Sequence, residues 1–166
     1  AAAQDEFRRE EVDVIISDHH LPGGPLPNAL AVLNPRRADD TSPDKDLAAV
    51  GVAWKLASAL LVEARSRGLD IPETYEKWLL DLVSIATITD IVPLVGENRV
   101  LERYGLRVLN KSRRPGLLSL FERAGLTRGD IKERDVGFAI GPRLNAAGRM
   151  EHASLALRLL LSETEE

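Results

Sequence analysis

A chain of 166 residues is long enough for one domain with a hydrophobic core, and 44% apolar with 29% charged residues is ordinary for a soluble globular protein. No apolar run is long enough to cross a bilayer and no signal-peptide pattern is present, so we expect no membrane partner. With no cysteine in the chain, a reducing cytoplasm is the expected location. The chain has no cysteine, which excludes disulfides and thiolate metal sites and leaves oxygen and imidazole ligands for any metal.

The net charge of −4 is unevenly distributed along the chain. Between Arg99 and Arg149 there are twelve Lys and Arg against five Asp and Glu, whereas the remainder holds ten against twenty-one. An asymmetry of this kind can place a basic face beside an acidic pocket. Ordinary solvated helix faces would produce the same counts, so the charge distribution alone identifies no ligand.

The first predicted elements are short strands joined by polar segments. A charged stretch at 6–11 is expected to be helical. The run at 12–17 is apolar and rich in β-branched residues, which predicts a strand buried on both faces in a parallel sheet. A second short strand is expected at 30–33, and a polar loop at 36–46 follows it.

Helices dominate the predicted structure of the remaining chain. The spacing of apolar residues predicts helices at 47–67, 73–86, 98–111, 117–124 and 154–161. The segment 141–149 is rich in turn-forming and basic residues, and we expect a loop there. Strands that lead into polar loops and alternate with long helices are typical of an α/β fold. We expect a parallel sheet flanked by helices, followed by a helical connecting region.

Three adjacent residues at the end of the first predicted strand could carry chemistry. Asp18, His19 and His20 combine a carboxylate with two imidazoles, a set that suits Mn²⁺, Fe²⁺ or Zn²⁺ and extends toward Mg²⁺ when more carboxylates join it. In open α/β sheets, ligands bind beyond the carboxyl ends of the strands. One histidine would ligate metal, and the other would meet a phosphate or orient the ligand. A loop with two surface histidines is the alternative.

Asp90 is a second candidate ligand. It stands between Thr89 and Ile91, directly after a mostly apolar predicted helix. An isolated carboxylate is costly to bury in such surroundings, so a specific partner such as a cation would explain it. The alternative is an ordinary cap at the start of the next helix.

Arg143, Asn145 and Arg149 form a third group, within the glycine-punctuated loop expected at 141–149. Guanidinium groups match phosphate oxygens with two parallel hydrogen bonds, and glycines let a backbone approach a ligand closely. The group therefore favours phosphate binding. Ordinary exposed arginines remain the alternative.

These pieces, in this order, resemble the DHH phosphoesterase superfamily. The resemblance extends from Val12 to about Leu161, and its motifs are the runs 12–23, 47–56, 87–94 and 141–150. The Asp-His-His tripeptide marks the superfamily as a whole. The run 141–150 is similar to the loop with which the single-stranded-DNA exonucleases of that superfamily handle DNA phosphates.

The resemblance implies hydrolysis of single-stranded DNA from its 5′ end at a two-metal site that holds Mn²⁺ or Mg²⁺. It implies a role in DNA repair and recombination, with repair or recombination proteins as partners. It implies that His19 and Asp90 ligate one metal, and that Asp18 and His20 support the metal site and contact the scissile phosphate. The residues it implies for holding the DNA backbone are Arg143, Asn145 and Arg149.

The chain departs from the family's pattern in ways that bear on activity. The upstream aspartates that complete the two-metal site, and the C-terminal domains that grip nucleic acid, have no match in it. We therefore interpret 1–112 as the C-terminal part of a DHH domain and 113–166 as a helical segment leading toward a second domain. His19 and Asp90 alone are too few ligands for a six-coordinate cation, so we expect this chain by itself to be inactive.

Two other functions stay open. One is another DHH phosphoesterase with the same catalytic core, namely an oligoribonuclease, a cyclic-dinucleotide phosphodiesterase or a pyrophosphatase. The basic balance between Arg99 and Arg149 favours a polymeric substrate over pyrophosphate. The other is a non-catalytic DNA-binding or scaffold module. The tripeptide and Asp90 argue against it, because a scaffold has no need of metal ligands.

Overall fold

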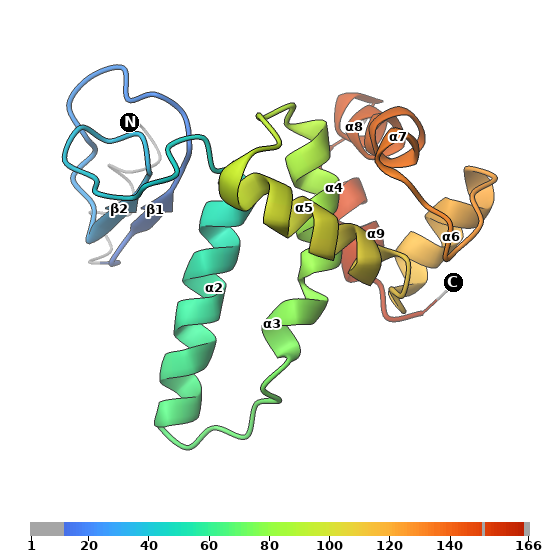
Figure 1. Ribbon diagram of the computed structural model, residues 1–166, viewed down its shortest axis with the longest axis horizontal. Helices are drawn as coiled ribbons and strands as arrows, with labels where there is room; N and C mark the ends of the chain where they lie inside the picture. Colours follow the sequence, from blue (N-terminus) through green and yellow to red (C-terminus); the bar gives the residue numbers. More distant parts are fainter. Residues whose placement is uncertain (1–11, 151, 165–166) are drawn as a thin grey trace.

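The protein is an α/β molecule dominated by helices, as expected. The structure, a computed structural model, describes residues 12–150 and 152–164; the helix expected at 6–11 lies outside them. A two-stranded sheet lies to one side of a group of helices (Figure 1). The elements are β1 (Ile15–Ser17), β2 (Ala31–Leu33), α2 (Ala49–Ser66), α3 (Tyr75–Trp78), α4 (Leu80–Thr89), α5 (Gly96–Leu109), α6 (Pro115–Arg123), α7 (Glu133–Asp135), the π-helical turn η1 (Val136–Ile140), α8 (Gly141–Met150) and α9 (Ser154–Leu161).

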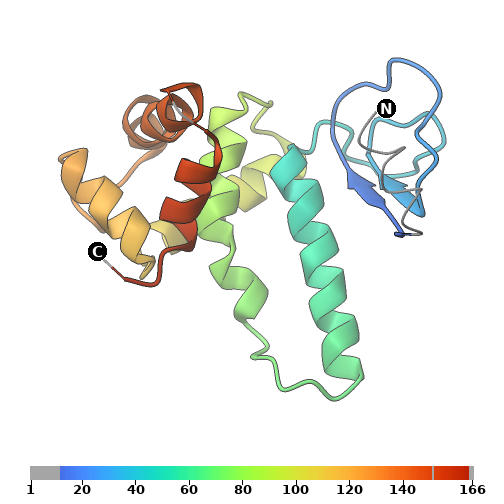
Figure 2. The same ribbon diagram turned by 180° about the vertical axis from the view of Figure 1, so that it is seen from behind.

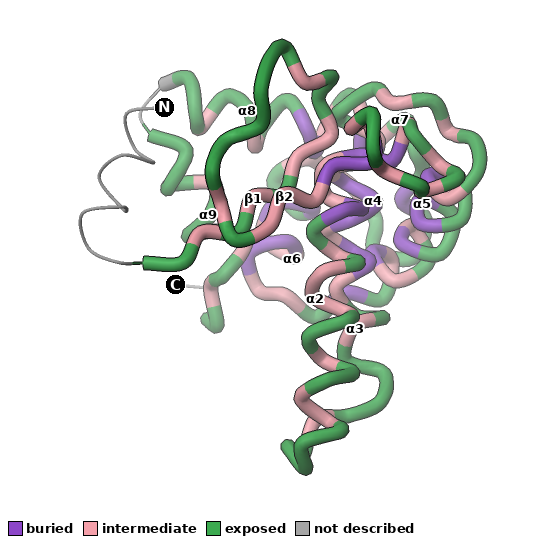
Figure 3. The backbone as a smooth tube through the Cα atoms, turned by 90° about the vertical axis from the view of Figure 1, so that its left-hand side faces the viewer, coloured by how far each residue is buried: buried purple, intermediate pink, exposed green. Residues whose placement is uncertain are grey.

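The two strands pair in parallel, as predicted, with Ile16 opposite Val32. The expectation that the first strand is buried on both faces is wrong, because Ile15 is 51% exposed. Within the described residues β2 is the single neighbour of β1 in the sheet. No residue of either strand is buried, whereas buried residues concentrate in the helices (Figure 3). The apolar run therefore predicted the position of the strand correctly, but not the exposure of its side chains.

Most of the predicted helices are confirmed. Those expected at 47–67, 98–111, 117–124 and 154–161 are α2, α5, α6 and α9, with ends shifted by at most two residues. The helix expected at 73–86 is divided at Leu79 into α3 and α4, and α4 continues to Thr89. The last helix, α9, packs against α6 and α8, as the view from behind shows (Figure 2). No helix within residues 12–150 and 152–164 is both long enough and apolar enough to cross a membrane.

The expectation of a loop at 141–149 is wrong, because these residues form α8. The helical path runs on from η1, where the Gly141 N–H donates to the Val136 carbonyl in the wide π spacing. A proline ring collides with the carbonyl four residues earlier in a regular α-helix. Pro142 instead follows the widened turn, in the first turn of α8. A Cβ on Gly141 would clash with the Thr89 side chain at the end of α4. This glycine therefore serves close helix packing rather than a turn.

Two clusters of buried apolar side chains form the core, and α4 contributes to both. One cluster lies among α4, α5, α6 and η1 and consists of Ile85, Leu109, Leu117, Leu120, Phe121, Ile131, Val136 and Ile140. The other lies where the start of α2 meets α4 and α5 and consists of Leu47, Val52, Leu80, Val83 and Leu101. Packing on two sides fixes the position of α4. The first cluster contains residues from before and after position 112. The division of the chain into 1–112 and 113–166 remains a prediction.

A buried ion pair also joins α4 to the segment between α5 and α6. Asp81 Oδ2 accepts hydrogen bonds from Arg114 Nε at 2.9 Å and from Ser112 Oγ at 2.9 Å. Only 3% of the Asp81 side chain is exposed. A carboxylate this deeply buried requires such partners, because an isolated charge is very costly in a low-dielectric interior. The same helix is held against α5 at Gly105, where a Cβ would clash with the Leu80 carbonyl oxygen.

Candidate active site

His19 and Asp90, far apart in the sequence, meet in the structure. His19 lies two residues beyond β1, and Asp90 is the residue that ends α4. His19 Nε2 and Asp90 Oδ2 are 3.4 Å apart, with 12% of the histidine side chain and 38% of the aspartate side chain exposed. The chain turns directly after Asp90, because Ile91 adopts a left-handed backbone with a φ of 57°. The end of the sheet and the end of α4 thus present one imidazole and one carboxylate to the same point.

The Asp18 carboxylate shapes the tripeptide. Its Oδ1 accepts the backbone N–H groups of His19 at 2.7 Å and His20 at 3.2 Å, and lies 2.7 Å from His20 Nδ1. The two imidazole rings pack edge to face with centroids 4.5 Å apart. Burial raises the pKa of Asp18, but hydrogen bonds from His20 and His19 outweigh it and hold the pKa below its ordinary value. Asp18 therefore stays ionised, holds the backbone of His19 and orients the ring of His20.

Asn34 braces this segment from β2. Its buried side chain donates from Nδ2 to the His20 carbonyl at 2.8 Å and accepts the Arg36 N–H at 2.9 Å. Asn34 was not among the site residues predicted from the sequence. Its position directly after a strand that pairs in parallel with β1 was the available signal, because the carboxyl ends of parallel strands lie at one edge of a sheet.

A groove of about 1180 Å³ contains the histidine–aspartate pair. Its walls come from the tripeptide, the start of α2, the end of α4, and the continuous helix formed by α7, η1 and α8. Of the predicted site residues, it is lined by His19, His20, Asp90 and Asn145. Asp18 reaches the groove indirectly, through its contact with His20.

The three residues expected to bind DNA phosphates are divided by the helical structure of α8. Asn145 lines the groove, whereas Arg143 lines a separate hollow between α6, α8 and α9 and donates from Nη1 to the Ala139 carbonyl at 2.8 Å. Arg149 is exposed near the end of α8. Residues spaced by two along a helix face different directions, which separates Arg143 from Asn145. The groove instead receives Arg134 and Phe138, for which the sequence carried no signal.

The pair suits a shared divalent cation. Imidazole nitrogen and carboxylate oxygen are both ligands of Mn²⁺, and two ligands at right angles, each about 2.1 Å from one ion, lie roughly 3 Å apart. The observed separation of 3.4 Å is close to that value. In the part of the chain that the structure describes, no group of three or more His, Cys, Asp or Glu side chains is arranged so that together they could hold a metal ion. An octahedral ion held here would therefore need further ligands from water, substrate or other residues.

Comparison with known proteins identifies the family. The family model described as "DHH family, N-terminal domain" matches residues 1–87. The chain belongs to the DHH family. This confirms the resemblance seen in the Asp-His-His motif, and the tripeptide lies within the matched part of this DHH chain.

Within the DHH family, the chain is similar to curated proteins named RecJ. "Single-stranded-DNA-specific exonuclease RecJ" of Bacillus subtilis (strain 168) is 47% identical over 152 residues, which cover 92% of this chain and 18% of that protein. RecJ of Escherichia coli (strain K12) is 41% identical over 169 residues, which cover 98% of this chain and 29% of that protein.

Among solved structures, "exonuclease RecJ bound to manganese" matches 99% of this chain and 39% of its own, with 37% identity and a TM-score of 0.80. RecJ in complex with Mn²⁺ from Thermus thermophilus matches 99% of this chain and 23% of its own, with 37% identity and a TM-score of 0.78. The DHH chain thus shares the fold of part of RecJ. It spans between 18% and 29% of the two curated relatives.

Proposed function

We propose that this protein hydrolyses phosphodiester bonds of single-stranded DNA from the 5′ end with Mn²⁺ or Mg²⁺, and that this chain supplies part of the active site. The observation that carries the proposal is the pair His19 and Asp90, whose Nε2 and Oδ2 atoms lie 3.4 Å apart in the wall of a large groove. The similarity to proteins named single-stranded-DNA-specific exonuclease, and to structures that hold manganese, supports it.

In this proposal His19 Nε2 and Asp90 Oδ2 hold one cation. When bound, the metals supply a water of lowered pKa and neutralise negative charge on the attacked phosphate and the leaving oxygen. Asp18 Oδ1 holds the backbone N–H groups of His19 and His20 and keeps the His20 ring in place. His20 uses Nδ1 to contact Asp18, so its Nε2 is free to donate to a phosphate oxygen when the ring is protonated.

Asn145, which lines the same groove, would contact the DNA strand beside the scissile phosphate through its side-chain amide. Arg143 and Arg149 lie outside the groove and would hold phosphates farther along the strand. Residues 1–112 would then be the C-terminal part of the DHH domain and 113–166 the helical segment leading toward a second domain. An exonuclease of this kind fits DNA repair and recombination in the cytoplasm, together with other proteins of those processes.

Substrate comparison tests the proposal. The complete protein that contains this chain, purified with Mn²⁺, is expected to degrade 5′-labelled single-stranded DNA much faster than short RNA, a cyclic dinucleotide or pyrophosphate. A preference for one of the last three would assign a different DHH phosphoesterase activity. Absence of metal-dependent hydrolysis with all four substrates would leave a non-catalytic module.

The chain alone is expected to bind Mn²⁺ weakly and to be inactive, because two protein ligands leave most positions of a six-coordinate ion to water. Calorimetric titration with Mn²⁺ is expected to show no saturable one-to-one step, and a nuclease assay no cleavage. The His19→Ala variant should remove the residual heat of binding, whereas the control His152→Ala should retain it, since His152 contacts Ser154 outside the groove. Tight stoichiometric binding with metal-dependent cleavage would contradict the prediction.

A further inference from the structure

Two large, exposed apolar residues line the groove beside the proposed metal ligands. Phe138 on η1 is 81% exposed, and Ile91, the residue after Asp90, is 89% exposed. Ile91 has a φ of 57°, a conformation that is strained for a β-branched residue. Strain and exposure at one point are tolerated where function requires them. The groove therefore combines polar ligands with an apolar surface that nothing in the described residues covers.

The π-helical turn decides how Phe138 is presented. The wide spacing of η1 interrupts the regular helix between α7 and α8, and π-turns occur frequently at functional sites. Gly137 precedes Phe138 and also lines the groove. A Cβ on Gly137 would meet only Ile88 Cγ2, at 3.8 Å, so the groove wall at Gly137 is not closely packed. Because 81% of Phe138 is exposed and the residue lines the groove, a flat ligand can approach its ring.

Arg134 adds a charge to this surface. Arg134 is exposed, precedes Phe138 by four residues in the sequence, and also lines the groove. Within residues 12–150 and 152–164 it forms no ion pair. An unpaired guanidinium beside an exposed phenyl ring matches the two chemical parts of a nucleotide, its phosphate and its base. Double-stranded DNA keeps its bases stacked and paired, whereas a single strand leaves them free to stack on protein rings.

We propose that Phe138 is a stacking platform for one base of the bound strand, with Arg134 on a neighbouring phosphate. The inference rests on the proposed function and deepens it, because it assigns the preference for single strands to a residue of this chain. With the scissile phosphate at His19 and Asp90, a neighbouring base would lie along the groove on Phe138. The partner is a nucleobase of any type, since every base has a π face and stacking is tolerant of sequence.

Binding of abasic oligonucleotides to the complete protein tests the inference. Single-stranded DNA with one abasic position, moved stepwise from the 5′ end, is titrated in EDTA, so that binding is read without cleavage. For the wild type, one position is expected to weaken binding by about 5- to 150-fold. Phe138→Ala should weaken binding of intact DNA by a similar factor. In this variant, an abasic site at the sensitive position of the DNA should cause no further loss of affinity. Phe138→Trp should retain the wild-type pattern.

The matched control is Tyr75→Ala, which removes an aromatic side chain that is 50% exposed on α3, outside the groove. It should leave binding unchanged. Independent, multiplying losses from Phe138→Ala and every abasic change would overturn the inference. So would a lowered Tm for Phe138→Ala with unchanged Kd, because the ring would then pack against protein. Cleavage of single-stranded DNA by the wild type with Mn²⁺ is measured in parallel. Absence of cleavage would contradict the proposed function, whereas the loss of affinity at the abasic positions tests the role of Phe138 separately.

Discussion

Alanine at His19 or at Asp90 in the complete protein is expected to lower Mn²⁺-dependent cleavage of single-stranded DNA by roughly a thousandfold or more. Each substitution removes one of the two side chains that approach the same point, with Nε2 and Oδ2 separated by 3.4 Å. Binding of DNA in EDTA is expected to change little, because the phosphate contacts proposed for Arg143, Asn145 and Arg149 remain.

The double variant His19→Ala/Asp90→Ala sharpens this expectation. If both residues hold one cation, the loss of either releases it, and the second substitution should add almost no further loss of kcat. His152→Ala and Asp70→Ala are the matched controls, a histidine and a carboxylate outside the groove, and should retain full activity. Multiplicative losses in the double variant, or substantial turnover in either single variant, would refute a shared metal.

The second large effect concerns stability. Arg114→Ala is expected to lower the free energy of unfolding by about 3 kcal/mol, because it leaves the Asp81 carboxylate buried without its cation. The Asp81 side chain is 3% exposed and would keep only the Ser112 hydroxyl, at 2.9 Å, and a backbone N–H as donors. Urea unfolding followed by circular dichroism measures the change.

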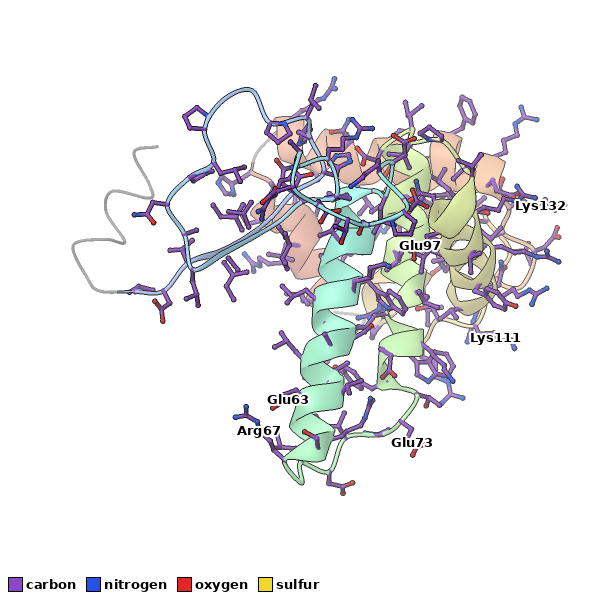
Figure 4. All side chains as sticks on the ribbon, turned by 60° about the vertical axis from the view of Figure 1, so that its left-hand side comes forward. Glu63, Arg67, Glu73, Glu97, Lys111 and Lys132 are labelled. Carbon is purple, nitrogen blue, oxygen red and sulfur yellow. The ribbon has the colours of Figure 1, made fainter. Side chains whose placement is uncertain are left out.

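Glu63→Ala is the control for the ion pair. Glu63 in the last turn of α2 forms an ion pair with Arg67, the residue that ends this helix (Figure 4). Both side chains are exposed, Glu63 to 58% and Arg67 to 73%. Its removal should change stability by only about 0–0.5 kcal/mol. Replacing both Asp81 and Arg114 by apolar residues of similar volume should recover much of the loss, because neither charge is then left unpaired. Equal effects for Arg114→Ala and Glu63→Ala would show that the buried pair does not secure α4.

Local pattern in the sequence was sufficient for most of the secondary structure. The apolar runs and helical spacings predicted β1, β2, α2, α5, α6 and α9. They did so because the spacing of apolar residues along the sequence follows the period of the element that packs them against the rest of the protein. The Asp-His-His motif and its place after β1 were also visible, and the family resemblance that rests on them is confirmed. The sequence was misleading at 141–149, where glycine and proline suggested a loop. There the glycine permits close packing on Thr89 and the proline follows a π-turn.

Only the tertiary structure decided which chemical groups share the groove. No local pattern relates His19 to Asp90; the resemblance alone had paired them. They meet because α4, packed into both core clusters and held through Asp81, ends beside the carboxyl edge of the sheet. The helical state of α8 placed Asn145 in the groove and Arg143 outside it, and η1 brought in Phe138. Side-chain direction depends on helix phase and packing, and both are set by contacts between residues distant in the sequence.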